Sequence, residues 1–150
     1  MSTLHGEYSF EDINGYRYEG RYESGLRVGR WNVFRPDGTP AWSTDWYRGV
    51  LHGTSTSWWP NGQKSQQGTY EKGLKSGTWG FWFENGQIAA LGQYREGRKR
   101  GAWSYWSERG TAMSYDDWIR ENDTYDWAYD DERGLPHGEN WPAPPSPPLN

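Results

Sequence analysis

The chain has 150 residues, a net charge of −4 and no cysteine, which excludes a disulfide-stapled scaffold and fits a single domain. It contains 12 Trp, 11 Tyr and 4 Phe, too many aromatic residues for a disordered chain, so we expect a core built mainly from rings. The first residues do not form a signal peptide, and no segment is apolar enough to cross a bilayer. These features predict a cytoplasmic protein that does not insert into a membrane.

The sequence repeats with a period of 24 residues. Glycine returns at this spacing in several registers, and aromatic residues return between the glycines. The clearest rows are Gly25, Gly49, Gly73, Gly97; Gly29, Gly53, Gly77, Gly101; Gly38, Gly62, Gly86, Gly110, Gly134; and Trp31, Trp79, Trp103, Trp127. A fixed period of this length indicates tandem supersecondary units, which usually build binding surfaces and not catalytic clefts.

In chain order, we predict a half repeat over 5–19 and full repeats over 20–43, 44–67, 68–91 and 92–115. The stretches between the turn residues are short and rich in Tyr, Trp and Thr, so each repeat should supply two strands and two turns. The expected fold is all-β: an elongated antiparallel meander of tandem 24-residue β-hairpins. Residues 1–134 form one repeat domain that closes with a degenerate cap over 116–134. A proline-rich tail over 135–150 follows, which we expect to be extended.

Two kinds of turn are expected in each repeat. Asn85-Gly86 and its counterparts predict type I′ hairpin turns, because both central residues then need positive φ. The spacing Gly73-x-x-x-Gly77 predicts a longer loop with a glycine at each corner.

Side-chain alternation places Trp79 and Phe81 on one face of the sheet and Trp82 on the other. Equivalent residues of successive repeats should lie about 9.6 Å apart, because they are two strand spacings apart. Rings in contact need centroids within about 7 Å, so rings from the intervening strand must interleave.

The unit that runs from Gly68 through Tyr70, Gly73, Gly77, Trp79 and Trp82 to Asn85-Gly86 resembles the MORN repeat. It is more similar to the bacterial variant of YwqK-like antitoxin-type proteins. The resemblance covers roughly residues 5–134. It implies consecutive β-hairpins and a protein that neutralises a toxin by binding it, and it transfers no catalytic residue. Choline-binding repeats are a competing resemblance, but their units are nearer 20 residues long.

The sequence contains no pattern typical of a catalytic, metal or cofactor site. The histidines His5, His52 and His137 are scattered, and we interpret them as structural or solvated. Basic residues lie near Tyr70 and Tyr94, a pattern also found in single-strand nucleic-acid binders. Acidic residues are mixed with them, so a solvated surface without nucleic acid is favoured. The basic residues are Lys72, Lys75, Arg95, Arg98, Lys99 and Arg100.

The charge is unevenly distributed, because residues 115–150 carry nine Asp or Glu and two Arg. Two compatible interpretations remain open: acids on the last strands prevent edge-to-edge aggregation, or they capture a cationic partner. A calcium loop is disfavoured because the central glycine is missing. The residues that we expect to contact a protein partner are Asp116, Asp117, Trp118, Asp123, Asp126, Trp127, Asp130 and Asp131.

The leading hypothesis is a non-enzymatic immunity or antitoxin-type protein that occludes a toxin with a basic active site, such as a nuclease. Exposed rings would supply contact area, and the acids would attract the partner. The alternatives are a module whose Trp and Tyr residues bind glycans or quaternary amines, and a structural scaffold.

Overall fold

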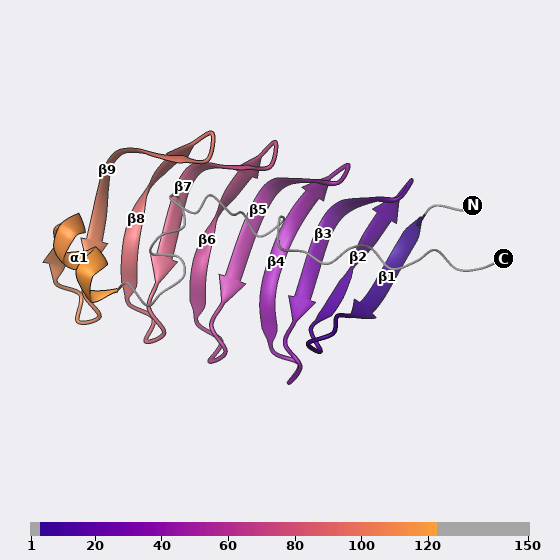
Figure 1. The fold of residues 1–150 in the computed structure, drawn as a ribbon, viewed down its shortest axis with the longest axis horizontal. Coiled ribbons are helices and arrows are strands. Elements are labelled where there is room, and N and C mark those ends of the chain that lie inside the picture. The colour runs from indigo at the N-terminus through magenta and orange to yellow at the C-terminus, as the bar shows by residue number, and fades with distance from the viewer. Residues whose placement is uncertain (1–3, 123–150) are drawn as a thin grey trace.

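The structure, a computed structural model, describes residues 4–122. This range forms one sheet in which each strand pairs antiparallel with its sequence neighbours, followed by one short helix (Figure 1). The elements are β1 (Gly6–Glu11), β2 (Arg17–Glu23), β3 (Leu26–Phe34), β4 (Pro40–Tyr47), β5 (Val50–Trp58), β6 (Lys64–Glu71), β7 (Leu74–Trp82), β8 (Ile88–Arg95), β9 (Arg98–Trp106), β10 (Ala112–Met113) and α1 (Tyr115–Glu121). The predicted all-β meander is confirmed, with two strands for each 24-residue repeat.

The type I′ turns lie at the hairpins where the sequence predicted longer loops. Lys72 and Gly73, between β6 and β7, have φ values of 52° and 85°. The same pair of positive φ values recurs at Ser24-Gly25, Arg48-Gly49 and Glu96-Gly97. These are two-residue turns whose twist matches that of the flanking strands. These four turns lie on the same side of the sheet, at the strand ends drawn at the top of Figure 1.

The predicted type I′ turn at Asn85-Gly86 is wrong. Only Gly86 has positive φ, its N–H donates to the Phe83 carbonyl at 3.0 Å, and the Phe83 N–H donates to the Gln87 carbonyl at 2.9 Å. This is a type I turn that ends in a glycine bulge. The Asn85 side chain has another task, because its Nδ2 donates to the Glu108 carbonyl of the next hairpin at 2.9 Å.

Gly77, the second glycine of the Gly-x-x-x-Gly spacing, lies inside β7 and not at a loop corner. Its φ is 70°, and the pairing of β6 with β7 shifts register between Gln67 and Thr69. The strand bulges at this point. The bulge brings Trp79 across from Gly68, the residue that the shift passes over.

The aromatic side chains of one face interleave as predicted. We call this the ring face and define it by Tyr22, Trp31, Tyr70, Trp79, Tyr94 and Trp103. Ring centroids lie 5.2 Å apart for Tyr70 and Trp79, 6.1 Å for Trp79 and Tyr94, and 5.1 Å for Tyr94 and Trp103. Trp79 therefore contacts a tyrosine of the strand before it and a tyrosine of the strand after it. Phe81 shares this face, and Trp82 lies on the other beside Lys64.

The start of the array contains a buried tyrosine that makes stability depend on alkaline pH. Burial, followed by the neighbouring Asp12 carboxylate, raises the pKa of Tyr18 to about 12, and the Tyr18 hydroxyl donates to Asp12 Oδ2 at 3.2 Å. The folded state then keeps a proton that the unfolded state releases above its ordinary pKa of 10.0. The contribution of Tyr18 to the free energy of unfolding should be fully present below pH 10 and should be lost between about pH 10 and pH 12.

Tyr18→Phe removes this proton, so its free energy of unfolding should decline less than that of the wild type over the same interval. The difference should reach at most about 2 kcal/mol, as measured by urea denaturation at pH 8 and pH 11. Tyr8→Phe is the matched control on the same face. Parallel pH profiles for Tyr18→Phe and the wild type would contradict the prediction.

The last repeat ends in a helix, α1, which lies at the start of the segment 116–134 that was expected to form a degenerate cap. Ser114 is the N-cap, and its Oγ accepts from the Asp117 N–H at 3.2 Å. Trp118 of α1 packs on Tyr105 of β9 with ring centroids 5.0 Å apart. The acids Asp116 and Asp117 therefore lie in the first helical turn, where the helix dipole favours negative charge, and not on an edge strand. Residues 123–134 and the predicted tail over 135–150 lie outside the described residues.

Candidate binding surfaces

The ring face is held together by close pairs of one glycine and one tryptophan. A Cβ atom on Gly68 would lie 2.1 Å from Cδ2 of Trp79, so the indole packs directly on the bare backbone of β6. Trp79 Nε1 donates to the Thr69 carbonyl at 3.0 Å. The pairs Gly20–Trp31 and Gly92–Trp103 repeat both contacts. We call these three the Gly–Trp pairs.

The second repeat replaces this pair with two small hydroxyl residues, Thr44 and Ser55. They face each other in register, and each is 1% exposed. Across the strands, the register runs from Trp31 through Thr44, Ser55 and Gly68. The row of indoles on the ring face is therefore interrupted once.

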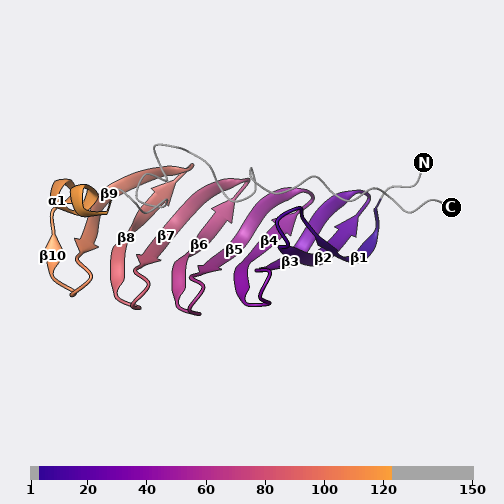
Figure 2. The same ribbon diagram turned by 60° about the horizontal axis from the view of Figure 1, so that its bottom comes forward.

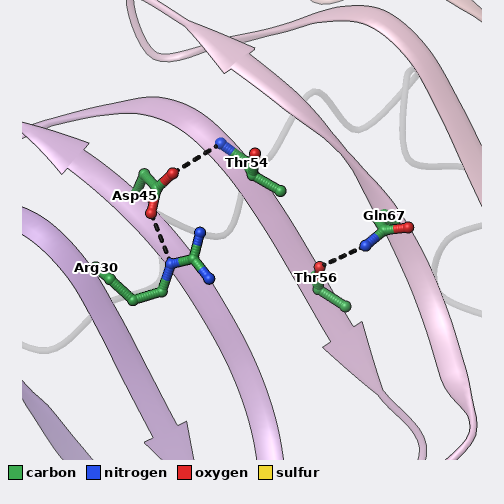
Figure 3. Close-up of polar contacts among 5 residues, drawn as sticks. All are labelled: Arg30, Asp45, Thr54, Thr56 and Gln67. Atoms are coloured by element: carbon green, nitrogen blue, oxygen red, sulfur yellow. Dashed lines mark hydrogen bonds and ion pairs between the residues drawn. The ribbon is translucent and has the colours of Figure 1, made fainter.

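A carboxylate joins three strands where the indole is missing. Arg30 Nε on β3 donates to Oδ1 of Asp45 on β4 at 2.7 Å, and the Thr54 N–H on β5 donates to Oδ2 at 3.1 Å (Figure 3). The hydrogen bond to Asp45 also raises the pKa of Arg30. Asp45 thus holds the bulge of β5, which the indole holds in the other repeats. The adjacent pair of strands is linked by Gln67 Nε2, which donates to Thr56 Oγ1 at 3.0 Å.

We predict that Asp45→Ala lowers the free energy of unfolding by about 2 kcal/mol, because both charge-assisted bonds are lost. Urea denaturation measures the change. Glu84→Ala removes an exposed acid from a turn and should change stability by less than about 0.5 kcal/mol. Equal effects of the two substitutions would show that Asp45 does not hold the bulge.

Three cations lie on the ring face, each over several rings. Lys75 is only 6% exposed, and its Nζ is 5.0 Å from the ring centroid of Trp79 and 5.1 Å from that of Tyr94. The corresponding cations, Arg27 and Lys99, lie two periods before and one period after Lys75, and each lies over three rings. Those rings are Tyr22, Trp31 and Trp46 for Arg27, and Trp103, Tyr105 and Tyr115 for Lys99.

Lys75 and Lys99 belong to the group of basic residues that was predicted from the sequence to form a solvated surface. That prediction is wrong for Lys75, which is buried, and Lys99 is half-buried. Burial lowers the pKa of Arg27, the first member of the row. The aromatic cages of the first, third and fourth repeats already contain the chain's own cations. This is a physical argument against quaternary amines as ligands of these cages, because an amine would have to displace a covalently attached cation.

Of the residues expected to contact a partner, Asp116 and Asp117 are exposed on α1, and Asp117 pairs with Arg120 at 3.2 Å. Trp118 is 1% exposed and belongs to the core, so its side chain offers almost no surface to a partner. The remaining five lie outside the described residues: Asp123, Asp126, Trp127, Asp130 and Asp131.

Aliphatic side chains form an exposed row on the side of the sheet where the type I′ turns lie. This row was not expected from the sequence. Leu26, Val50 and Leu74 are 46%, 44% and 46% exposed, and each begins the strand after such a turn. We call these three residues the hairpin ridge. A Cβ atom on Gly49 would lie 3.1 Å from Leu26 Cδ2, so Leu26 leans on the turn of the next repeat. The 24-residue spacing of the three was the signal that could have revealed the ridge.

The described residues contain no group of His, Asp and Glu side chains arranged to hold a metal ion. His52 has a structural contact, because its Nδ1 accepts from the Lys72 N–H at 3.2 Å. Across residues 4–122, no helix has the length and apolar character that a membrane span needs. Figure 2 shows the open arrangement of the strands, with α1 at one end.

No known family model and no curated protein matches the sequence. Among solved structures, the chain is similar to crystal structures of TarM. One match has 11% identity and a TM-score of 0.34 over 65% of this chain and 21% of the TarM chain. A second is an S. aureus TarM mutant in complex with Fondaparinux, alpha-GlcNAc-glycerol and UDP, with 10% identity and a TM-score of 0.34 over 64% of this chain and 21% of that one. The chain thus spans about a fifth of the proteins it matches, and the similarity is too low to carry a functional argument.

Proposed function

We propose that this protein is a non-enzymatic binding protein of the immunity or antitoxin type, which occludes a bacterial toxin in the cytoplasm. The main support is the hairpin ridge, because three aliphatic side chains stay exposed at a fixed spacing beside the type I′ turns. A row of apolar groups on a rigid sheet suits a protein partner, since partner binding would remove these groups from water. The resemblance to antitoxin-type repeats supplies the class of partner.

The acidic end supplies the second part of the proposal. Asp116 and Asp117 are exposed on α1 at one end of the array, and five further acids follow over residues 123–132. Concentrated negative charge accelerates encounter with a cationic surface and opposes binding to acidic ones. A toxin with a basic active site, such as a nuclease, fits this pattern. The ridge would contribute apolar contact area, and the acids would orient the partner.

A protection assay tests the proposal. Cells express the product of the adjacent gene together with the wild type or with the double variant Asp116→Lys, Asp117→Lys. We expect the wild type to restore growth and the variant to lose most of its protection. The control Glu71→Lys, Glu84→Lys reverses two exposed acids on the body of the sheet and should protect like the wild type.

Two results would refute the proposal in different ways. Full protection by the Asp116→Lys, Asp117→Lys variant would remove the acidic contact. Absence of protection by the wild type, with both proteins present and folded, would remove the toxin as the partner.

A further inference from the structure

The strand β1 forms an open edge of the sheet. Within residues 4–122 it comes first in the strand order and pairs with β2 alone (Figure 1). All of its residues, from Gly6 to Glu11, pair without a shift of register, whereas each pairing from β2 to β9 contains one shift. In an antiparallel pair, every second residue directs its N–H and C=O groups away from the neighbouring strand. The free side of β1 is therefore a regular row of backbone donors and acceptors.

The opposite end of the sheet is protected in a way that β1 is not. There, β10 pairs with Tyr105 and Trp106 of β9, and Trp118 of α1 packs on Tyr105. The first part of β9 carries successive cations at 98–100, followed by Gly101 with a φ of 66°. Basic side chains and bulges keep edge strands from pairing with other chains. The sequence of β1 contains no lysine, arginine or proline, so this end of the sheet is the one open to an added strand.

Two carboxylates on this edge form no ion pair within the described residues. Glu7 and Glu11 are exposed, and each lies directly opposite an arginine of β2. The arginine opposite Glu11 is Arg17, and its Nε donates to Glu19 of its own strand at 3.0 Å. The arginine opposite Glu7 bonds to an acid of its own strand in the same way. The open edge therefore combines unpaired backbone groups with negative charge that β2 does not bind.

The side chains of β1 indicate what an added strand should contain. Glu7, Ser9 and Glu11 lie on one face, and Tyr8 and Phe10 lie on the other, where they are half-buried. An antiparallel strand would continue the meander. Basic residues suit the positions opposite Glu7 and Glu11, because opposite charges across a strand pair attract. Apolar residues suit the positions opposite Tyr8 and Phe10, where they would extend the aromatic packing.

A second copy of β1 does not have this pattern. An antiparallel copy that pairs all of 7–11 places Glu7 of each chain opposite Glu11 of the other. Like charges directly opposite each other destabilise a strand pair. The two acids therefore oppose self-pairing and select a basic strand.

We propose that β1 is a strand-addition site for a basic extended segment of a partner protein. The segment pairs antiparallel with β1 and sets its cations against Glu7 and Glu11. Backbone hydrogen bonds supply most of the affinity, and the alternate side chains supply the selectivity. This site is separate from the acids on α1, because the two lie at opposite ends of the strand order, about 40 Å apart along the sheet. It does not depend on the proposed toxin contact.

Peptide binding tests the charge selectivity of the site. The probe is a fluorescently labelled peptide, Thr-Thr-Lys-Val-Thr-Val-Lys-Thr-Thr, and its counterpart carries Glu in place of both Lys. By fluorescence anisotropy, the wild type should bind the lysine peptide at least about tenfold more tightly than the glutamate peptide. Glu7→Gln with Glu11→Gln should lower this ratio to less than about threefold. The control Glu71→Gln with Glu84→Gln removes the same charge from exposed acids elsewhere on the sheet and should preserve the ratio.

Backbone methylation of the lysine peptide distinguishes strand addition from simple charge attraction. N-methyl groups on alternate residues remove the donors along one side of an extended peptide and leave the other side intact. One of the two alternate sets should weaken binding at least about tenfold, and the other should have little effect. Hydrogen exchange locates the bound peptide, which should slow the exchange of amides in β1 and leave those in β9 unchanged.

Several results would overturn the proposal. They are no binding of the lysine peptide at millimolar protein, equal affinity for both peptides, equal effects of the two methylated sets, or protection outside β1. Sedimentation of the free protein tests the other occupant and should show a monomer. A dimer that the lysine peptide dissociates would assign the edge to a second copy, which also contradicts the proposal. The protection assay changes α1 and not β1, so either proposal can fail while the other stands.

Discussion

Gly68→Thr should destabilise the protein by about 3–5 kcal/mol. A Cβ atom at this position would lie 2.1 Å from the Trp79 ring, and the contact is with the fused core of the indole and not with a flexible tip. The indole must leave its site, where it is fully buried and bonded to the Thr69 carbonyl. Displacing a buried tryptophan costs about as much as truncating it. Urea denaturation, followed by tryptophan fluorescence, measures the loss.

The second repeat shows how this loss can be relieved. It carries Thr44 and Ser55 where the other repeats carry a Gly–Trp pair. Trp79→Ser alone should also cost about 3–5 kcal/mol, because it leaves a cavity. Gly68→Thr combined with Trp79→Ser recreates the natural pair of the second repeat. The double variant should therefore be more stable than the sum of the single losses implies, by at least about 2 kcal/mol.

A matched control makes the same two substitutions in two different Gly–Trp pairs. Gly68→Thr with Trp103→Ser changes the tryptophan of the following repeat and should give additive losses. Additive losses for both double variants would show that the fit between glycine and indole does not organise the ring face. The same conclusion would follow if Gly68→Thr alone were tolerated.

The second large effect is expected at Trp118, whose side chain closes the end of the array. Trp118→Ala should cost about 3–5 kcal/mol, because the indole is 1% exposed and packs on Tyr105. Asp116→Asn in the preceding helical turn should change stability by less than about 1 kcal/mol, since the residue is exposed and its main effect is on the helix dipole. Thermal unfolding and near-ultraviolet circular dichroism distinguish the two.

Partner binding gives the complementary readout for the same residues. Trp118→Ala should weaken binding only as far as it unfolds α1. If this variant keeps the wild-type melting temperature but loses the partner, Trp118 is a contact residue after all. Its burial would then not contribute to the stability of the free protein.

Much of the fold follows from local sequence because each repeat contains its own turns and strands. The faces of Trp79 and Trp82 follow from alternation alone, and the ring spacing requires the interleaving that the structure contains. Contacts between hairpins are not encoded locally in this way. Asn85 bonds to the carbonyl of Glu108, 23 residues away, and its turn differs from the type I′ geometry that Asn-Gly favours in isolated hairpins.

The helix and the buried cations show why parts of the candidate site could not be predicted. Trp118 continues the 24-residue spacing of Tyr22, Trp46, Tyr70 and Tyr94, which all lie on strands, so periodicity alone favours a strand at this position. The local signal of Ser114 followed three residues later by Asp117 matches a helix N-cap, but a short helix has little periodicity of its own. Lys75 looks solvated in a polar stretch, and only the strand register reveals that it pairs with Tyr70 on the ring face.

The proposed function depends most directly on whether the full chain binds the product of the adjacent gene through its acidic end. Isothermal titration at about 50 mM and 300 mM salt measures both affinity and charge dependence. We predict a one-to-one complex that weakens at least tenfold at the higher salt and in the Asp116→Lys, Asp117→Lys variant. The absence of any heat of binding at micromolar concentrations would contradict the account. So would a variant Asp116→Lys, Asp117→Lys that binds as tightly as the wild type at both salt concentrations.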